Sequence, residues 1–198
     1  MTGSKRAMDL LLGSVGLIVA IPMMGLIALL MRLSGDDGPF LYRAPRIGEG
    51  GRVITVLKIR TMREGATGSR LTSTSDARIT RVGRLLRRVR IDELPQLINV
   101  VRGEMSLVGP RPEDPMFVDF TDPLHRKVFT ARPGITGLAQ LEFHDEARIL
   151  AGEDSERRYR EVVLPAKLRL DAKYLDERTT MLDLKILART VGAVLGSD

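Results

Sequence analysis

The chain has 198 residues, which is enough for one medium-sized domain with a hydrophobic core. It contains no cysteine, so disulfide bonds, thiol catalysis and cysteine-based metal sites are excluded. The formal net charge of +6 favours anionic partners, and the lack of tryptophan favours phosphates or lipid over stacked nucleic-acid bases.

The N-terminal segment is predicted to enter a membrane. From Leu10 to Met31 no residue is charged, and a helix of that length would be about 33 Å long, close to the thickness of the hydrocarbon core. Basic residues lie on both sides, so the positive-inside rule draws both ends toward the cytoplasm. Pro22 can kink the helix so that it enters and leaves by one face, and a straight spanning helix is the alternative.

Asp9 stands at the edge of this apolar segment. A buried carboxylate needs a partner, and Lys5 and Arg6 are the nearest candidates along the chain.

The next stretch has the alternating pattern of a β-hairpin around a Gly50-Gly51 turn. In its second half Lys58 and Arg60 fall on one face at the end of the strand. They can hold a phosphate together, and a solvated basic edge is the alternative.

A basic amphipathic helix is predicted to follow, with Ser75 or Asp76 as its N-cap. Its polar side carries arginines, and its apolar stripe consists of Ile79, Val82, Leu85, Leu86 and Val89. Such a helix suits a membrane surface or a phosphate site, and a plain solvated face is the alternative.

The adjacent acids Asp92 and Glu93 are predicted to begin a helix that runs to Gly103, with Pro95 in its first turn. The helix dipole there would lower the pKa values of both carboxylates and keep both acids ionised. One acid can then attack an electrophile while the other holds a hard cation such as Mg²⁺. The alternative is a purely structural role, with Asp92 as the N-cap and Glu93 favoured by the helix dipole.

Two stiff turns follow, each rich in proline and glycine. One presents Arg111 within Gly109–Pro112, and the other presents Arg132 ahead of Gly137. A rigid loop that presents an arginine suits bidentate recognition of phosphate.

The C-terminal third is predicted to be helical, from Ser155 to Tyr174 and again after Thr179 or Thr180. The last helix has a broad apolar stripe that can pack on the core or lie in the membrane interface. The predicted fold class is α+β, predominantly helical with a small β-hairpin.

The motifs "KIRTM", "RIDELPQLINVVRGEMSLVGPRP", "RPGITGLAQ" and "LDLKIL" occur in this order over nearly the whole chain. On these motifs the chain resembles the bacterial sugar transferase family, the monotopic polyprenyl-phosphate phosphoglycosyl transferases. The resemblance implies a re-entrant membrane helix over 1–34, broken at Pro22. It also implies a catalytic domain over 35–198, on the cytoplasmic face of the bacterial inner membrane, with interfacial amphipathic helices.

The activity that the resemblance implies is the first membrane step of bacterial glycan assembly. A sugar 1-phosphate passes from a nucleotide sugar, with UDP the expected carrier, to polyprenyl (undecaprenyl) phosphate, and UMP is released. The implied mechanism is ping-pong, with Asp92 as the nucleophile that forms an aspartyl-phosphosugar intermediate and Glu93 as the Mg²⁺ ligand. The residues expected to bind substrate are Lys58, Arg60, Arg87, Arg111, Arg132, Gln140 and His144.

The sequence departs from the family pattern at two places. Ile21 precedes the proline where many members have serine, and "LEFHDEARIL" replaces an Asn-Gly-Arg-Asn-like run, which places His144 near a family arginine. His144 is therefore expected to make a different sugar or nucleotide contact, and a surface loop residue is the alternative. The sugar, the glycan pathway and a homodimer stay open.

Three other functions compete with the transferase. A membrane-tethered protein could bind nucleic acid or anionic lipid through its arginine-rich helix, and it would need no Asp92. A metal-dependent phosphohydrolase would release the sugar phosphate to water without a lipid acceptor. A structural scaffold leaves the acid pair and the rigid arginine loops unexplained.

Overall fold

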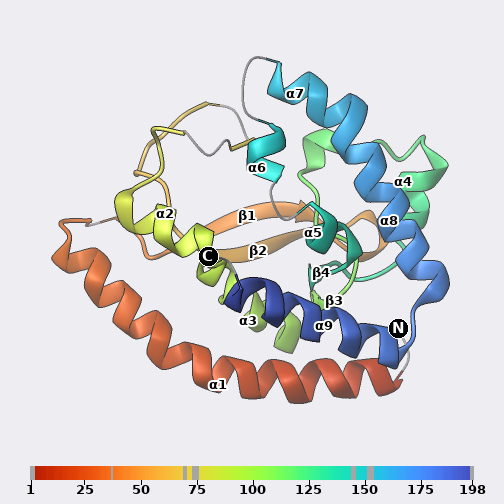
Figure 1. Cartoon of the computed structure of the whole chain (residues 1–198), viewed down its shortest axis with the longest axis horizontal. Helices are drawn as coiled ribbons and strands as arrows, with labels where there is room; N and C mark the ends of the chain where they lie inside the picture. The colour runs from red at the N-terminus through yellow and green to blue at the C-terminus, as the bar shows by residue number, and fades with distance from the viewer. Residues whose placement is uncertain are drawn as a thin grey trace.

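The computed structural model is mostly helical, with a β-hairpin and a short parallel pair of strands at its centre (Figure 1). It describes residues 3–36, 38–68, 71–72, 76–143, 146–150 and 154–196. The N-terminal half contains α1 (Gly3–Leu33), β1 (Leu41–Ile47), β2 (Val53–Ile59), α2 (Arg81–Arg88) and α3 (Gln96–Arg102). The C-terminal half contains β3 (Ser106–Val108), α4 (Pro123–Val128), β4 (Gly134–Thr136), α5 (Leu138–Glu142), α6 (Glu146–Ile149), α7 (Ser155–Arg158), α8 (Leu164–Glu177) and α9 (Thr180–Leu195).

Helix α1 is continuous and passes through Pro22. Figure 1 shows it bowed along one edge of the molecule, with its hollow side toward the hairpin and α3. By length and composition α1 could cross a membrane. The break predicted at Pro22 does not occur, since α1 continues through this residue. A helix that curves around the protein core can accommodate the backbone donor that proline lacks.

One face of α1 packs on the rest of the protein. Its buried residues are Asp9, Gly13, Ala20, Ile27 and Met31. A Cβ atom at Gly13 would lie 3.2 Å from Val100 in α3, so the small residue lets the two helices approach closely. At the other end of α1, Ile27 and Met31 join a core cluster with Ile59 and Leu86.

The partners of Asp9 differ from the predicted ones. Its carboxylate accepts hydrogen bonds from Ser106 Oγ at 2.8 Å and from the Leu107 amide at 3.0 Å. Lys5 instead pairs with Asp183 at 2.7 Å, and Arg6 donates to the carbonyls of Val100 and Val101. The prediction was wrong because all three side chains reach across to other elements.

The hairpin prediction is confirmed. Strands β1 and β2 pair antiparallel, from Leu41 opposite Ile59 to Ile47 opposite Val53. The turn between them places Gly50 and Gly51 at positive φ, which favours glycine. Asn99 of α3 docks on β2, since its side chain donates to the Thr55 carbonyl at 2.8 Å and accepts from the Leu57 amide at 3.1 Å.

Helix α2 begins later than predicted. Thr80 is its N-cap, because the threonine hydroxyl accepts a hydrogen bond from the Gly83 amide at 2.9 Å. Asp76 pairs with Arg78 instead, and Ser75 lies outside the described residues. On the expected apolar stripe Leu86 is buried, but Leu85 is 64% exposed, so α2 presents an apolar side chain to its surroundings.

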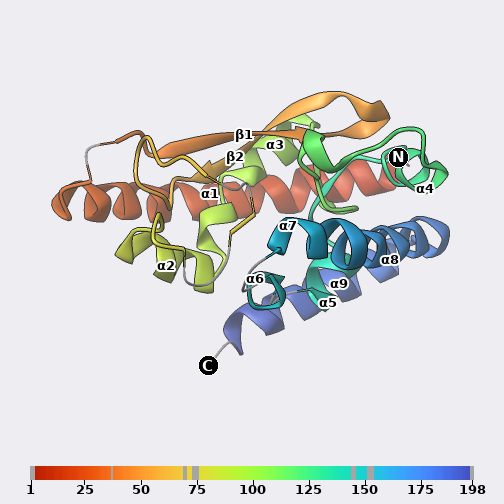
Figure 2. The same cartoon turned by 90° about the horizontal axis from the view of Figure 1, so that it is seen from above.

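The short strands β3 and β4 pair in parallel and bring the two predicted stiff turns together. Any Cβ atom at Gly134 would lie 2.1 Å from the Gly109 amide nitrogen, and one at Gly137 would lie 2.3 Å from the Gly109 carbonyl oxygen. These glycines are therefore required by close backbone approach. Behind this pair, α8 and α9 contribute Tyr174 and Ile186 to the main core cluster, and Figure 2 shows them on the side opposite the hairpin.

Candidate active site

The acid pair lies in a tight turn, not in the first turn of α3 as predicted. Residues Ile91–Glu93 form a 3₁₀ turn, and α3 starts only at Gln96 after Pro95. Arg90, which has a left-handed backbone (φ 54°), reverses the chain after α2 and aims this turn back toward β2. The two carboxylates are thus held by a turn that packs between α2 and the hairpin.

Both acids face a cleft of about 760 Å³. The hairpin, the acid turn, the loop after β3, α5 and the start of α8 contribute to its walls. Basic side chains outnumber acidic ones in the lining; they are Arg46, Lys58, Arg60, Arg63, Arg78, Arg87, Arg90, Arg111 and Lys167. Such a cleft suits a polyanionic ligand, because the low-dielectric walls focus the positive potential.

Asp92 is 8% exposed, and no hydrogen bond joins its carboxylate to another described side chain. Burial raises the pKa of Asp92 to about 6, although Lys58 and Arg87 oppose the shift. The expected lowering of this pKa by a helix dipole is therefore wrong, because Asp92 lies in the turn ahead of α3 and desolvation is the larger effect there. The result is a carboxylate that has no side-chain hydrogen-bond partner and is mostly ionised at neutral pH.

Glu93 has the opposite character. Burial alone would raise its pKa, but the Lys58 ammonium at 2.7 Å and the nearby Arg111 lower the pKa of Glu93 to about 2. Lys58 therefore serves as a fixed counter-ion of the acid pair. Glu93 stays charged over the physiological range, as a ligand for a hard cation must.

Arg111 is presented by the loop after β3. Its backbone amide donates to Asp171 at 3.1 Å, and the neighbouring Pro110 carbonyl accepts from the Gly134 amide at 2.8 Å. Burial alone would lower the pKa of Arg111, but the carboxylates of Glu146, Glu93 and Glu113 raise the pKa above its ordinary value. The loop therefore holds a permanent positive charge close to Glu93.

The other predicted cations have separate tasks. Arg87 donates to Thr61 Oγ1 at 2.7 Å, and burial lowers its pKa. Arg60 is largely engaged with the protein, because it donates to the carbonyls of Pro39 and Met62 and pairs with Asp36. Arg60 thus braces the cleft wall.

The last three predicted binding residues differ in their placement. Gln140 lines the cleft, and its buried Oε1 has no hydrogen-bond partner among the described residues. Arg132 does not line the cleft, because its guanidinium pairs with Glu49 of the hairpin turn at 3.1 Å. His144 lies outside the described residues.

A polar cluster at the floor of the cleft was missed by the sequence reasoning. Lys167 of α8 pairs with Glu113 and Glu146, each at 3.1 Å, and Tyr159 donates to Glu113 at 2.6 Å. Lys167 and Tyr159 belong to the apolar face of one helical stretch. A lysine on such a face signals a buried acidic partner, and this signal is readable in the sequence.

The acid pair offers carboxylate oxygens, which are the ligands that Mg²⁺ prefers. No cluster of three or more potential metal ligands occurs in the described part of the chain. However, Mg²⁺ usually keeps several waters and binds one or two carboxylates together with substrate phosphates. Glu93, ionised beside the Asp92 carboxylate, fits that mode.

Comparison with known proteins identifies relatives over almost the whole chain. Residues 1–197 match the family described as bacterial sugar transferase. The chain is 38% identical to the UDP-glucose:undecaprenyl-phosphate glucose-1-phosphate transferase of Caulobacter vibrioides, over 98% of this chain and 70% of that protein. It is 40% identical to the undecaprenyl-phosphate glucose phosphotransferase of Komagataeibacter xylinus, over 94% of this chain and 35% of that protein.

A third relative is the UDP-N-acetylgalactosamine-undecaprenyl-phosphate N-acetylgalactosaminephosphotransferase of Aeromonas hydrophila, 36% identical over 96% of this chain and 43% of that protein. The chain thus spans less than half the length of two of these three relatives. The match covers the acid turn, the arginine loop and the apolar helix α1 alike. The chain belongs to the bacterial sugar transferase family.

Proposed function

We propose that the protein is a phosphoglycosyl transferase that moves a sugar 1-phosphate from a UDP-sugar to undecaprenyl phosphate and releases UMP. The activities for which its relatives are named support this class of donor and acceptor. The observation that carries the proposal is the environment of Asp92, a buried carboxylate without a side-chain partner in a cleft lined by basic residues.

The proposed reaction has two displacements at the same phosphorus atom. Asp92 attacks the β-phosphorus of the donor, a carboxylate O–P bond forms, and the bond to the α-phosphate oxygen breaks to release UMP. An oxygen of the lipid phosphate then attacks that phosphorus and frees the Asp92 carboxylate. The first step leaves the sugar phosphate on the protein, so the soluble donor and the lipid acceptor need not be bound together.

Charge neutralisation is what the cleft supplies to this reaction. A carboxylate approaches a diphosphate dianion only when positive groups offset the repulsion. Arg111 and Arg87 flank the acid pair and suit the phosphate oxygens, whereas Lys58 holds Glu93 in place. Mg²⁺ held by Glu93 would add charge neutralisation at the diphosphate.

The membrane part of the proposal is a re-entrant α1. Both ends of α1 pack on one and the same domain, through Asp9 near the N-terminus and through Met31 near the C-terminus. A helix that crossed the bilayer would carry these contacts to opposite sides. We therefore place α1 with its exposed apolar face in one leaflet, and the basic flanks favour the cytoplasmic leaflet of the inner membrane.

Two further helices suit the membrane interface. Leu85 of α2 is exposed, as are Met181 and Val191 of α9. These side chains would lie at the level of the lipid headgroups and bring the cleft to the height of the lipid phosphate.

The test is UMP release by the full chain with Mg²⁺, undecaprenyl phosphate and a panel of UDP-sugars. Multiple turnovers that require the lipid, and that are abolished in Asp92→Asn, are expected. Lys127→Met is a matched control, because it removes a charge from the exposed Lys127–Asp176 pair outside the cleft. UMP release that continues without lipid would indicate the phosphohydrolase instead.

A further inference from the structure

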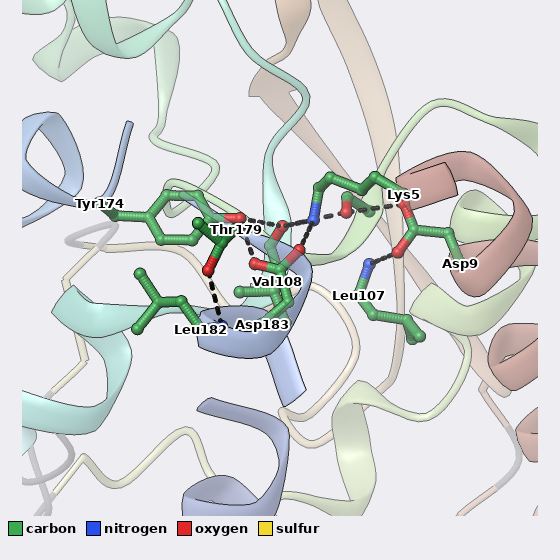
Figure 3. A network of polar contacts seen from close by, with 9 residues as sticks. Lys5, Asp9, Leu107, Val108, Tyr174, Thr179, Leu182 and Asp183 are labelled. Carbon is green, nitrogen blue, oxygen red and sulfur yellow. Dashed lines mark hydrogen bonds and ion pairs between the residues drawn. The ribbon is translucent and has the colours of Figure 1, made fainter. Parts of the chain in front are cut away.

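Lys5, at the N-terminal end of α1, reaches the carbonyl of Val108 (Figure 3). Val108 is the last residue of β3 and directly precedes the Gly109–Pro112 turn. Three side-chain donors approach its oxygen: Lys5 Nζ and Ser106 Oγ, each at 2.9 Å, and the Tyr174 hydroxyl at 3.2 Å.

The three donors differ in how many protons they can offer to the Val108 carbonyl. The Tyr174 hydroxyl has one proton and lies 2.7 Å from the Asp183 carboxylate, closer than to the Val108 oxygen. The Ser106 hydroxyl likewise lies 2.8 Å from the Asp9 carboxylate. A hydrogen bond to a carboxylate is stronger than one to a backbone carbonyl, so both hydroxyls donate mainly to the carboxylates.

Lys5 is different because its ammonium group has three protons. It donates to Asp183 at 2.7 Å and still has a proton for the Val108 carbonyl. The Lys5 side chain is 13% exposed and that of Asp183 is 2% exposed, so water competes weakly for these bonds. Lys5 is thus the donor that can serve the Val108 carbonyl continuously.

The same end of α1 also holds the outer edge of β3. Strand β3 pairs with β4 on one side, where the Gly109 amide donates to the Thr136 carbonyl at 2.9 Å. On the other side Asp9 accepts from the Leu107 amide, as a neighbouring strand would. Both edges of this three-residue strand are therefore fixed, one by β4 and the other by α1.

We infer that Lys5 is a positioning residue, through which the N-terminal end of the membrane helix sets the placement of the Arg111 loop. The inference rests on the proposed function for the role of Arg111 at the donor phosphates. Its structural content is the coupling between α1 and the loop, which can be measured without turnover. The coupling would let the docking of α1 order the phosphate-binding loop.

The test variant is the double change Lys5→Met with Asp183→Asn in the full chain, in lipid nanodiscs. Replacing Asp183 as well avoids a buried carboxylate without its cation. Arg6→Met is the matched control, because it removes a neighbouring positive charge of α1 whose hydrogen bonds go to α3. Both variants thus carry an equal change in the cationic charge of α1.

The first readout is amide hydrogen exchange of the peptide covering 106–112, which contains the bonded amides of Gly109 and Arg111. We expect faster exchange there in the Lys5 variant and no change in Arg6→Met, in which the peptide covering 96–103 exchanges faster instead. Unchanged exchange at 106–112 in the Lys5 variant would overturn the inference, whatever the activity.

The second readout is a double-mutant cycle with Arg111→Ala. We expect kcat to fall about tenfold in the Lys5 variant, the size of one lost charge-assisted hydrogen bond, and to fall no further when Arg111 is already alanine. Lys5→Arg should restore most of kcat. An equal loss in both Arg111 backgrounds would mean a general defect and would contradict the inference.

The two readouts separate this inference from the proposed function. A wild-type chain that turns over no donor, while the 106–112 peptide loosens in the Lys5 variant, would contradict the transferase and support the coupling.

Discussion

Asp92 and Glu93 are adjacent in the chain, yet their pKa values shift in opposite directions. Burial raises the pKa of Asp92 to about 6. Burial would also raise the pKa of Glu93, but Lys58 and Arg111 lower it to about 2. The carboxyl proposed as the nucleophile therefore titrates just below neutral pH, and its neighbour is a permanent anion.

The first prediction concerns the pH dependence of the reaction. Only the ionised form of Asp92 can attack phosphorus, and its pKa is about 6 in the folded protein. The value of kcat/KM should therefore rise through about pH 6 and level off above it, with no second step from Glu93 above about pH 3. A rate profile flat from pH 5 to pH 8 would contradict the assignment of Asp92.

The second prediction concerns stability. The folded-state pKa of Asp92 lies above the ordinary value of 3.8, so its ionised form destabilises the fold at neutral pH. Asp92→Asn should therefore raise the free energy of unfolding at pH 7.5 by about 3 kcal/mol. The gain should shrink as the pH falls through about 6 and vanish below about 4.

Glu93→Gln is the opposing control in the same denaturant titrations. The folded-state pKa of Glu93 is depressed, so its contribution is stabilising above the ordinary value of 4.5 and is lost toward about pH 2. Glu93→Gln should therefore destabilise the protein at neutral pH. Two variants that shift stability in the same direction would contradict the assigned environments.

The third prediction separates the counter-ion from the nucleophile. Lys58 is the leading influence that lowers the pKa of both acids against their burial. Lys58→Met should therefore raise the pKa of Asp92, so the rise of kcat/KM should occur at a pH above about 6. The measurement is the rate profile at saturating and limiting donor, and an inflection that stays in place would show that Lys58 does not act on Asp92.

The fourth prediction concerns the seat of α2. A Cβ atom at Gly83 would lie 2.2 Å from the carbonyl oxygen of Thr61, which follows β2 in the chain. Gly83→Ala should therefore force α2 to move away from this segment. The free energy of unfolding should fall by more than about 1 kcal/mol, even though alanine has a better helix propensity than glycine. Gly192→Ala in α9 is the control, because its Cβ meets nothing within 4 Å, and it should leave the melting temperature equal or higher.

The hairpin and the helical character were predictable because they depend on local signals. Alternating apolar residues around Gly50-Gly51 specify two strands, and the uncharged run in α1 specifies a long helix. The start of α2 was not predictable in the same way. Asp76 and Thr80 are both good capping residues, and the choice between them depends on the ion pair of Asp76 with Arg78.

The environment of the candidate site depends on contacts between distant segments. The pKa of Asp92 is set by burial, which no property of the "RIDELPQL" stretch encodes. Arg132 resembles Arg111 in its proline-rich setting, yet Glu49, 83 residues away, draws it out of the cleft. Asp9 likewise meets Ser106 and Leu107 across about half of the chain, beyond the reach of a local pattern.

The measurement that tests the central claim most directly is the mass of the full chain after incubation with Mg²⁺ and its UDP-sugar in the absence of lipid. A stoichiometric burst of UMP is predicted, together with one sugar phosphate on the peptide that contains Asp92. Undecaprenyl phosphate should then remove the adduct as the lipid product forms. Lipid-dependent turnover with no adduct at any time, or wild-type turnover by Asp92→Asn, would contradict Asp92 as the nucleophile.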